Sequence, residues 1–369
     1  MNKQLIYSCV VLIYTLLLTG CLETSIVDEV SMVRAASFDL EEDGKLKLTV
    51  IFPTFPDKGQ EQTLEQRIIE ATGETTKGTK IWLNKNAQKP ILFGQVRVLL
   101  FSQALAEQGL EKYIDAMYRN PAVGNRISLG IVEGNDAGAL LDVDLGIGDS
   151  AGVFLPELIE QNQDTSTLPP TNMHEFLFSL YNDGRDSYLP LIVQSDNKVF
   201  VAGTALFSGD KFHSKLNFED SFFMKLLLDT TRQGIHEFAI QDQEQTSYVV
   251  IEKLNSDFKR RVDKSGDVPL FIFDVMIDGA IEDYDGQMNL DETDTLNKIQ
   301  QTIEKQISNR AQELLIQFRN EGIDPVGIGE KYRSTTRNWN AEKWKNELYP
   351  SAEFEVNVDL RIIQSGAVE

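Results

Sequence analysis

The sequence predicts an α+β, multi-domain mixed α/β protein with largely antiparallel sheets, whose C-terminal domain packs a long helix on an antiparallel sheet. The last strand candidate, 353–362, alternates polar and apolar residues, a pattern typical of a sheet with one buried face. Segment 296–318 carries apolar residues at steps of three and four, which predicts one apolar stripe on a helix. Strand and turn signals follow one another closely over 199–281, as they do in hairpins.

The chain has 369 residues, enough for two or three domains of about 150 residues each beyond a short leader. A hydrophobic content of 41% and 20 Phe supply material for packed cores, so a disordered tether is excluded. The predicted division is a lipoprotein signal peptide, an N-terminal mixed α/β domain, a middle domain and a C-terminal α+β domain. These parts span 1–20, 21–190, 191–265 and 266–369, in that order.

The leader ends in Leu18-Thr19-Gly20-Cys21, after a single early Lys3 and an apolar run of about 14 residues. Small residues before a cysteine fit a lipoprotein signal peptidase, and the thiol of Cys21 can accept a diacylglyceryl group. The alternative is an uncleaved membrane helix, which needs roughly 20 apolar residues. The pattern therefore predicts lipidation at Cys21 and a position on the outer face of a membrane.

The net charge argues against a nucleic-acid-binding protein, and the cysteine count argues against a disulfide-stabilised one. The 35 Lys and Arg stand against 57 Asp and Glu, a net charge of −22, so nucleic acid and anionic lipid heads repel the body as a whole. Membrane attachment is thus expected through acyl chains instead of a polybasic dock. Cys9 leaves with the signal and Cys21 carries the lipid, so no disulfide is expected in the mature chain.

In the first domain, the alternation of 46–52 predicts a half-buried strand, which prolines after Phe52 end. The polar segment 61–76 is expected to hold a short helix and a turn. The apolar run 91–101 predicts a buried strand. Two helices over 102–119 and a strand over 126–133 follow.

The rest of the chain is expected to begin with a polar loop over 161–170, which ends in two prolines. The further elements predicted before the long helix are a helix over 172–182, a strand over 199–207, a helix over 218–229, and strands over 234–240, 247–254 and 270–281. Gly322 is expected to end the long helix in a left-handed conformation, and a short helix should then carry Trp344.

No strong catalytic motif is present, so neither an enzyme nor a cofactor is predicted. Gly146, Gly148 and Gly152 miss the dinucleotide-binding spacing by one residue and fit a glycine-rich turn. The three histidines fall in different predicted elements, whereas a zinc or proton-transfer site needs several groups to converge. They are His174, His213 and His236.

Two weaker candidates are read as structural. Segment 281–292 places acidic residues and Gly286 at some positions of a calcium loop, but Ile281 occupies the first ligand position and a strand precedes it. An acidic turn without metal is therefore the preferred interpretation. Trp339 and Trp344 could stack on a sugar, but packing under the final strand is favoured.

The chain resembles the Ger(x)C lipoproteins, the C subunits of spore germinant receptors in endospore-forming Firmicutes. After Cys21, the blocks that carry the resemblance occur in the family's order: 101–110, 113–121, 174–190, 201–207 and the tail Gly322-Ile323-Asp324-Pro325-Val326-Gly327-Ile328-Gly329. The chain departs from the family at Leu22, Gln95 and Pro325, where the family often has Trp, His and an apolar residue.

The resemblance implies a three-domain body without enzymatic activity, on the outer surface of the spore inner membrane. Its implied partners are two integral membrane subunits, A and B, which form with it a receptor for nutrients. The B subunit resembles an amino-acid transporter and is the better candidate for germinant binding, which leaves assembly and signal relay to the C subunit.

Two other classes of lipoprotein are alternatives to a receptor subunit. A substrate-binding lipoprotein of an uptake system needs two similar lobes, and a lipid-anchored cell-wall hydrolase needs a catalytic group; the sequence indicates neither. For a receptor subunit, Arg119 and Arg126 are possible partner contacts, because they are basic residues on an acidic body. Local salt bridges are the alternative role for both.

Overall fold

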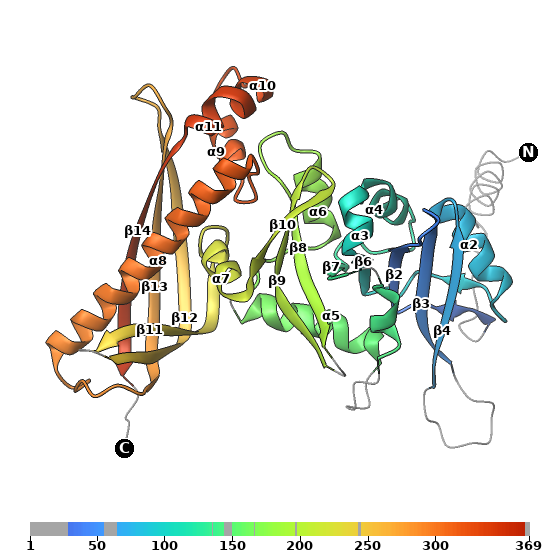
Figure 1. Ribbon diagram of the computed structural model, residues 1–369, viewed down its shortest axis with the longest axis horizontal. Helices are drawn as coiled ribbons and strands as arrows, with labels where there is room; N and C mark the ends of the chain where they lie inside the picture. Colours follow the sequence, from blue (N-terminus) through green and yellow to red (C-terminus); the bar gives the residue numbers. More distant parts are fainter. Residues whose placement is uncertain are drawn as a thin grey trace, which may run out of the picture.

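The computed structural model describes residues 29–54, 65–134, 136–143, 150–165, 167–195, 198–242 and 245–365. Two sheets lie next to each other along the long axis of the molecule, one built from the first part of the chain and one from the last (Figure 1). Within the described residues, no helix is both long enough and apolar enough to cross a bilayer.

The first sheet has eight strands in the order β10-β9-β8-β7-β6-β2-β3-β4. The four central strands β8, β7, β6 and β2 are parallel, and the strands on either side of them are antiparallel. Their bounds are β2 Ala35–Leu40, β3 Leu46–Thr54, β4 Glu65–Gly73, β6 Val98–Ser102, β7 Ser128–Val132, β8 Tyr188–Ser195, β9 Lys198–Ser208 and β10 Lys211–Asn217. A separate parallel pair joins β1 (Ser31–Met32) to β5 (Ile91–Leu92).

Helices cover both faces of this sheet. The core on one face, where Phe38 stacks on Phe101, receives side chains from four helices: α2 Thr76–Lys85, α3 Gln103–Gln108, α4 Glu111–Tyr118 and α6 Met173–Leu180. The core on the other face is built with α5 (Ala151–Asp164), through Leu155 and Ile159. Burial on both faces explains why the central strands are continuous apolar runs.

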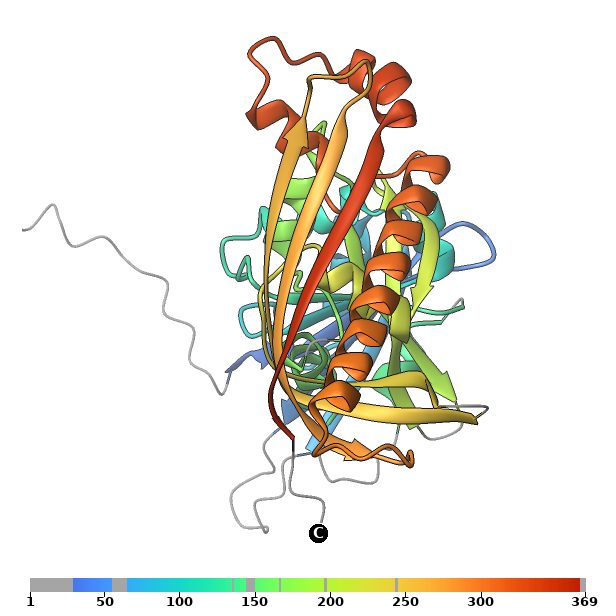
Figure 2. The same cartoon turned by 90° about the vertical axis from the view of Figure 1, so that its left-hand side faces the viewer.

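The second sheet has four strands in the order β11-β12-β13-β14, with α8 packed along it (Figure 2). The bounds are β11 Thr231–Asp242, β12 Gln245–Asp263, β13 Leu270–Tyr284, α8 Thr293–Glu321 and β14 Glu353–Ser365. The predicted stripe of α8 is buried in the core: Ile299, Ile303, Ile307, Ala311, Leu314, Leu315 and Phe318. Gly322 ends α8 with φ of 74°, as expected.

Four short helices and a π turn complete the C-terminal half. They are α7 Phe218–Leu226, α9 Ile328–Ser334, α10 Ala341–Lys343, the π turn Trp344–Leu348 and α11 Tyr349–Ser351. The mixed α/β fold class, with mostly antiparallel pairing and a C-terminal helix on a sheet, is confirmed.

Several local predictions were wrong. Segment 65–73, expected to be helix and turn, is the edge strand β4, whose polar residues are tolerated because it pairs with one neighbour only. α5 continues to Asp164, into the predicted loop. The run 91–101 divides into β5 and β6. β14 is parallel to β13, because α8 and the short helices form the long crossover that parallel pairing requires.

The predicted middle domain, 191–265, contributes strands to both sheets. β9 and β10 extend the first sheet, whereas β11 and β12 form half of the second. The domain boundaries themselves stay a prediction.

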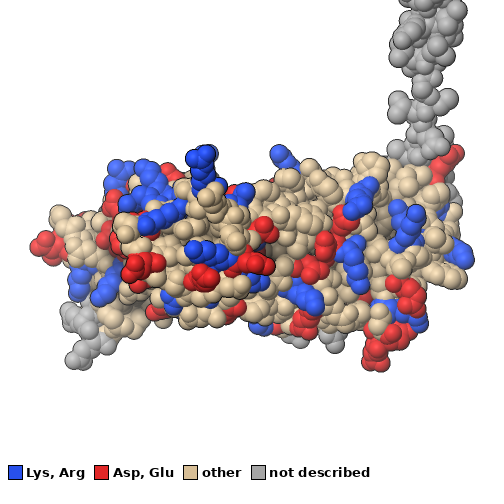
Figure 3. All heavy atoms as spheres, turned by 90° about the horizontal axis from the view of Figure 1, so that it is seen from above, with Lys and Arg blue, Asp and Glu red and all other residues tan. Residues whose placement is uncertain are grey.

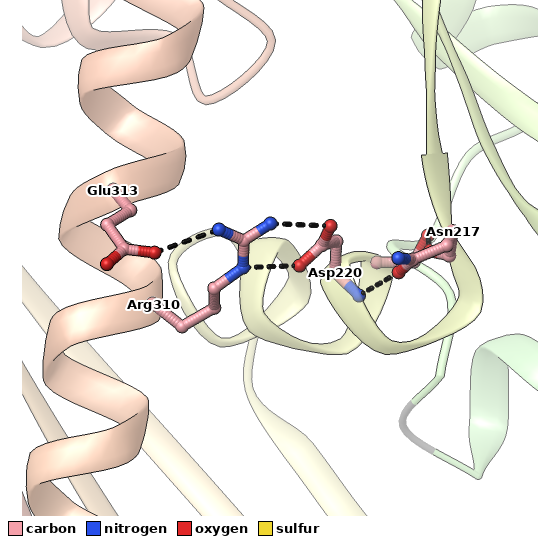
Figure 4. A network of polar contacts seen from close by, with 5 residues as sticks. Asn217, Asp220, Arg310 and Glu313 are labelled. Atoms are coloured by element: carbon pink, nitrogen blue, oxygen red, sulfur yellow. Dashed lines mark hydrogen bonds and ion pairs between the residues drawn. The ribbon is translucent and has the colours of Figure 1, made fainter.

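An ion-paired network joins α8 to α7 (Figure 4). Two guanidinium nitrogens of Arg310, Nε and Nη2, donate to the carboxylate of Asp220 at 2.6 and 2.8 Å. The third, Nη1, donates to Glu313 at 2.9 Å. The Asp220 side chain is 12% exposed and that of Glu313 is 63% exposed. Since exposed pairs contribute little, the fork between Arg310 and Asp220 is the stabilising half.

Replacing Asp220 by asparagine is expected to lower the free energy of unfolding by about 1.5–3 kcal/mol, because it removes the charge that Arg310 binds with two hydrogen bonds. Urea denaturation measures the effect. Glu313→Gln is the matched control on the same arginine, with an expected change below about 0.5 kcal/mol. Equal losses in the two variants would contradict the assignment.

Candidate functional site: the joint between the two sheets

Two segments far apart in the chain meet between the sheets, and we call them the joint: 182–187, which leads into β8, and 322–330, which follows α8. Four hydrogen bonds connect them. The Asp324 amide donates to the Asp186 carboxylate at 2.7 Å, and the Asp186 amide donates to the Asp324 carbonyl at 2.9 Å. The Glu330 amide donates to the Gly184 carbonyl at 2.8 Å, and the Asn182 side-chain amide donates to the Glu330 carboxylate at 2.9 Å.

The Asp324 side chain is buried and organises the turn from α8 to α9. Its two carboxylate oxygens accept the amides of Ile328 and Gly329, at 2.9 and 2.7 Å. Burial raises the pKa of Asp324 to about 6, against the lowering effect of these amides, and the nearby Asp186 carboxylate raises it further. Burial also raises the pKa of Asp186. Two carboxylates thus share the joint.

Two glycines let the segments approach at backbone distance. A Cβ on Gly184 would lie 2.6 Å from the Glu330 nitrogen and the Gly329 carbonyl carbon. A Cβ on Gly329 would lie 2.5 Å from Nε1 of Trp344 and 2.9 Å from the Gly184 Cα. Any side chain at either position therefore forces the joint apart.

Aromatic side chains support the joint from the C-terminal side. Trp344 is buried, stacks on Tyr332 with 5.1 Å between ring centroids, and contacts Tyr349 and Trp339. The Tyr349 hydroxyl donates to the carbonyl of Ile323, just before Asp324. Packing of the two tryptophans near the final strand agrees with the structural interpretation made from the sequence.

A hollow of about 320 Å³ opens beside the joint. Its walls come from both halves of the chain and include Asp183, Gly184, Asp186, Asp324, Trp344 and Lys345. Both oxygens of Asp186 accept backbone amides, from Asp324 and Gly209. Asp324 likewise accepts two amides, so both carboxylates hold backbone segments together.

The residues predicted as partner contacts do not lie in the joint's polar network. Arg119 ends α4 with its side chain 78% exposed, and its Nε lies 2.8 Å from Asp115, the local salt bridge considered above. Arg126 is exposed in the turn before β7. Cys21, Gly146 and Gly148 lie outside the described residues. Partner contact at Arg119 and Arg126 and lipidation at Cys21 stay predictions.

The histidines occupy separate places. His236 stacks on Phe222 with 3.9 Å between ring centroids, and burial lowers its pKa to about 4. His213 lies 3.6 Å from Glu321, and His174 lies in the first turn of α6. No group of three or more His, Cys, Asp or Glu within the described ranges could hold a metal ion. In segment 281–292, the Asp285 carboxylate instead accepts the Tyr248 amide.

Sequence reasoning did not identify Asp186, Asp324, Gly184 and Gly329 as one site. All four lie in blocks that carry the resemblance: Gly184 and Asp186 in 174–190, and Asp324 and Gly329 in the tail 322–329. The available signal was the pairing of glycine and aspartate in both blocks, which suits close backbone contact.

Known spore germination proteins match this chain over nearly its whole length. The sequence profile "Spore germination protein N-terminal domain" matches residues 23–194, and "Spore germination B3/GerAC like, C-terminal" matches residues 202–366. The chain is 32% identical to the spore germination protein GerQC of Bacillus cereus, over 97% of this chain and 98% of the relative. It is 22% identical to the putative spore germination protein YfkR of Bacillus subtilis strain 168, over 99% of this chain and 98% of the relative.

Among solved structures, the crystal structure of the GerBC protein superposes with a TM-score of 0.56 at 14% sequence identity. The match covers 89% of this chain and 96% of GerBC, and it supports the fold. The two profiles together span nearly all of the chain after residue 22. The first covers most of the first sheet, and the second covers the whole second sheet. The chain therefore belongs to the GerAC-like family of spore germination proteins, the Ger(x)C family that its sequence blocks resemble.

Proposed function

We propose that this chain is the lipid-anchored, non-enzymatic C subunit of a nutrient germinant receptor. A diacylglyceryl group on Cys21 holds it at the outer surface of the spore inner membrane, where it contacts the integral A and B subunits. The observation that carries this proposal is the pair of family matches over 23–194 and 202–366, which begin directly after the lipidation motif.

Its role in the receptor is assembly and signal relay. The joint supports this role, because backbone hydrogen bonds and the contact of Gly184 with Gly329 couple the two sheets without a flexible linker between them. A displacement imposed on one sheet by a membrane subunit is therefore passed to the other. Arg119 and Arg126 are the contact residues proposed for the first half.

The experiment that tests this proposal compares spores that lack the gene with spores that carry Cys21→Ala. Loss of refractility is followed with a panel of nutrients. We expect the deletion to abolish germination with one nutrient class. Cys21→Ala should abolish it as well, because the body without acyl chains binds a membrane too weakly to stay anchored there.

Calcium dipicolinate and dodecylamine serve as controls, since both should still trigger germination of either strain. Unchanged germination with every nutrient, in a strain without other receptors of this kind, would refute the receptor assignment. Loss in the deletion but not in Cys21→Ala would refute the anchor alone.

A further inference from the structure

Helix α2 presents large apolar side chains to solvent. Thr75 caps its N-terminus, and Thr79 and Leu83 face the core of the first sheet. On the outward side, Ile81 is 56% exposed and Trp82 is 53% exposed. Two adjacent exposed residues of this size on a ten-residue helix have no explanation in the packing of the described residues, so this outer face needs an occupant.

The charge of the helix segment itself is opposite to that of the chain. Segment 75–90 contains four lysines and no acidic residue, whereas the whole chain has a net charge of −22. Lys77 and Lys85 lie one turn before and one turn after Ile81, on the same helical stripe. The Lys85 ammonium lies 3.9 Å from the centre of the Trp82 ring. Since charges beyond about 8–10 Å are screened by salt, this local positive charge acts at the helix surface.

The position of α2 is fixed close to the start of the described chain. The Ser31 amide donates to the Pro90 carbonyl at 2.9 Å, and Ser31 pairs with Ile91 in the two-stranded sheet. Ser31 follows Cys21 by ten residues, so the two can lie at most about 36 Å apart when this stretch is fully extended. An acyl chain on Cys21 therefore keeps the β1–β5 pair, which directly follows α2, within about 36 Å of the lipid surface.

Other exposed aromatic residues lie on the same side of the first sheet. α4 and α6 bury their inner faces in the same core as α2, and Tyr118, Phe178 and Tyr181 are exposed on or just after them. In the view from above (Figure 3), acidic and basic side chains are interspersed, with broad uncharged areas between them, so the visible face is not uniformly acidic. Tryptophan and tyrosine at a protein surface suit the headgroup region of a bilayer.

We infer that the outer face of α2, formed by Lys77, Ile81, Trp82 and Lys85, docks on the headgroup region of an anionic bilayer beside the lipid anchor. The inference rests on the proposed lipidation of Cys21. Trp82 also lines a hollow that contains the acidic side chains of Glu41, Glu42, Asp43 and Glu74. Acidic groups are repelled by an anionic surface, so the contact is made on the side of the helix that carries Lys77, Ile81 and Lys85. Apolar insertion and local charge then act as a second signal that fixes the orientation of the body relative to the acyl chains.

The mature chain 21–369 with Cys21→Ser, which cannot be acylated, tests the contact itself. Binding is measured by co-sedimentation with vesicles of phosphatidylglycerol and phosphatidylcholine in equal parts, and with vesicles of phosphatidylcholine alone. Tryptophan fluorescence is followed in parallel, and the signal of Trp82 is the difference between the parent chain and the Ile81→Ser/Trp82→Ser variant, because Trp339 and Trp344 are present in both. We expect measurable binding to the anionic vesicles with a blue shift, and a loss of about tenfold or more in the Ile81→Ser/Trp82→Ser variant.

The matched control is Ile235→Ser/Tyr248→Ser, which removes two similarly exposed residues from β11 and β12 and should bind like the parent chain. Lys77→Gln/Lys85→Gln should weaken binding to the anionic vesicles only. The inference is overturned if the parent chain binds neither vesicle, which would point to a protein partner for α2, or if the α2 and control variants bind equally. The vesicles contain no receptor subunits and this chain carries no lipid. A failure to bind vesicles would therefore overturn the α2 contact alone, whereas the germination experiment tests the receptor assignment separately.

Discussion

Valine at position 184 is expected to lower the free energy of unfolding by about 3 kcal/mol or more, close to the largest effect of a single overpacking substitution. The new Cβ would meet backbone atoms of Gly329 and Glu330 at 2.6 Å, and backbone cannot move aside as a side chain does. Separation of the segments also lengthens the hydrogen bond from the Glu330 amide to the Gly184 carbonyl. In thermal unfolding the midpoint should fall by roughly 6–12 °C.

Gly266→Val is the matched control, because a Cβ there meets only the Val268 carbonyl oxygen, at 3.7 Å. Its midpoint should stay within about 2 °C of the wild type. In spores, Gly184→Val should reproduce the deletion phenotype while Gly266→Val germinates normally. If both glycine variants unfold alike, the close contact in the joint does not stabilise the protein.

The second large effect is a pH dependence that comes from Asp324. Its pKa of about 6 in the folded protein lies above the ordinary value of 3.8. Between these values the folded chain binds more protons than the unfolded chain, so this group adds stability as pH falls. That contribution is complete below about pH 3.8 and is lost as pH rises through about 6. Its amplitude is on the order of 3 kcal/mol.

The test compares urea unfolding of the wild type and Asp324→Asn at several values between pH 4 and 7. The difference in unfolding free energy between the two proteins should change by about 2 kcal/mol over this range, with the wild type gaining stability toward acid pH. Taking the difference removes the contributions of Asp39, whose pKa is also about 6, and of His236, which acts in the opposite direction. Asp267→Asn, in an exposed turn, should keep the wild-type profile. Parallel profiles for the wild type and Asp324→Asn would contradict the role of Asp324.

Much of the fold could be predicted because the spacing of apolar residues within one segment depends on which face of that segment is buried. The spacing of Ile299, Ile303 and Ile307 predicts the buried side of α8, and the alternation from Phe354 onward predicts the buried face of β14. Family membership followed from the order of several short blocks, and it is confirmed by the two matching profiles.

What could not be predicted depends on which distant segments meet. The composition of 65–73 fits a turn as well as an edge strand, and only the pairing with β3 decides between them. The alternation in β14 is the same for either strand direction, so the parallel pairing with β13 was missed. The joint could not be predicted for the same reason, because Asp186 and Asp324 are 138 residues apart in the sequence. Periodicity carries no information about contacts of that range.

The parallel placement of β14 has a consequence for how the chain is made. β13 is flanked by β12 on one side and by β14 on the other, and β14 leaves the ribosome after β11, β12, β13 and α8. Until it arrives, the long edge of β13 is unpaired and part of the apolar stripe of α8 has no cover. A chain that ends before Glu353 keeps both defects, an unpaired strand edge beside exposed apolar surface. Such a product is prone to aggregation and to degradation by quality-control proteases.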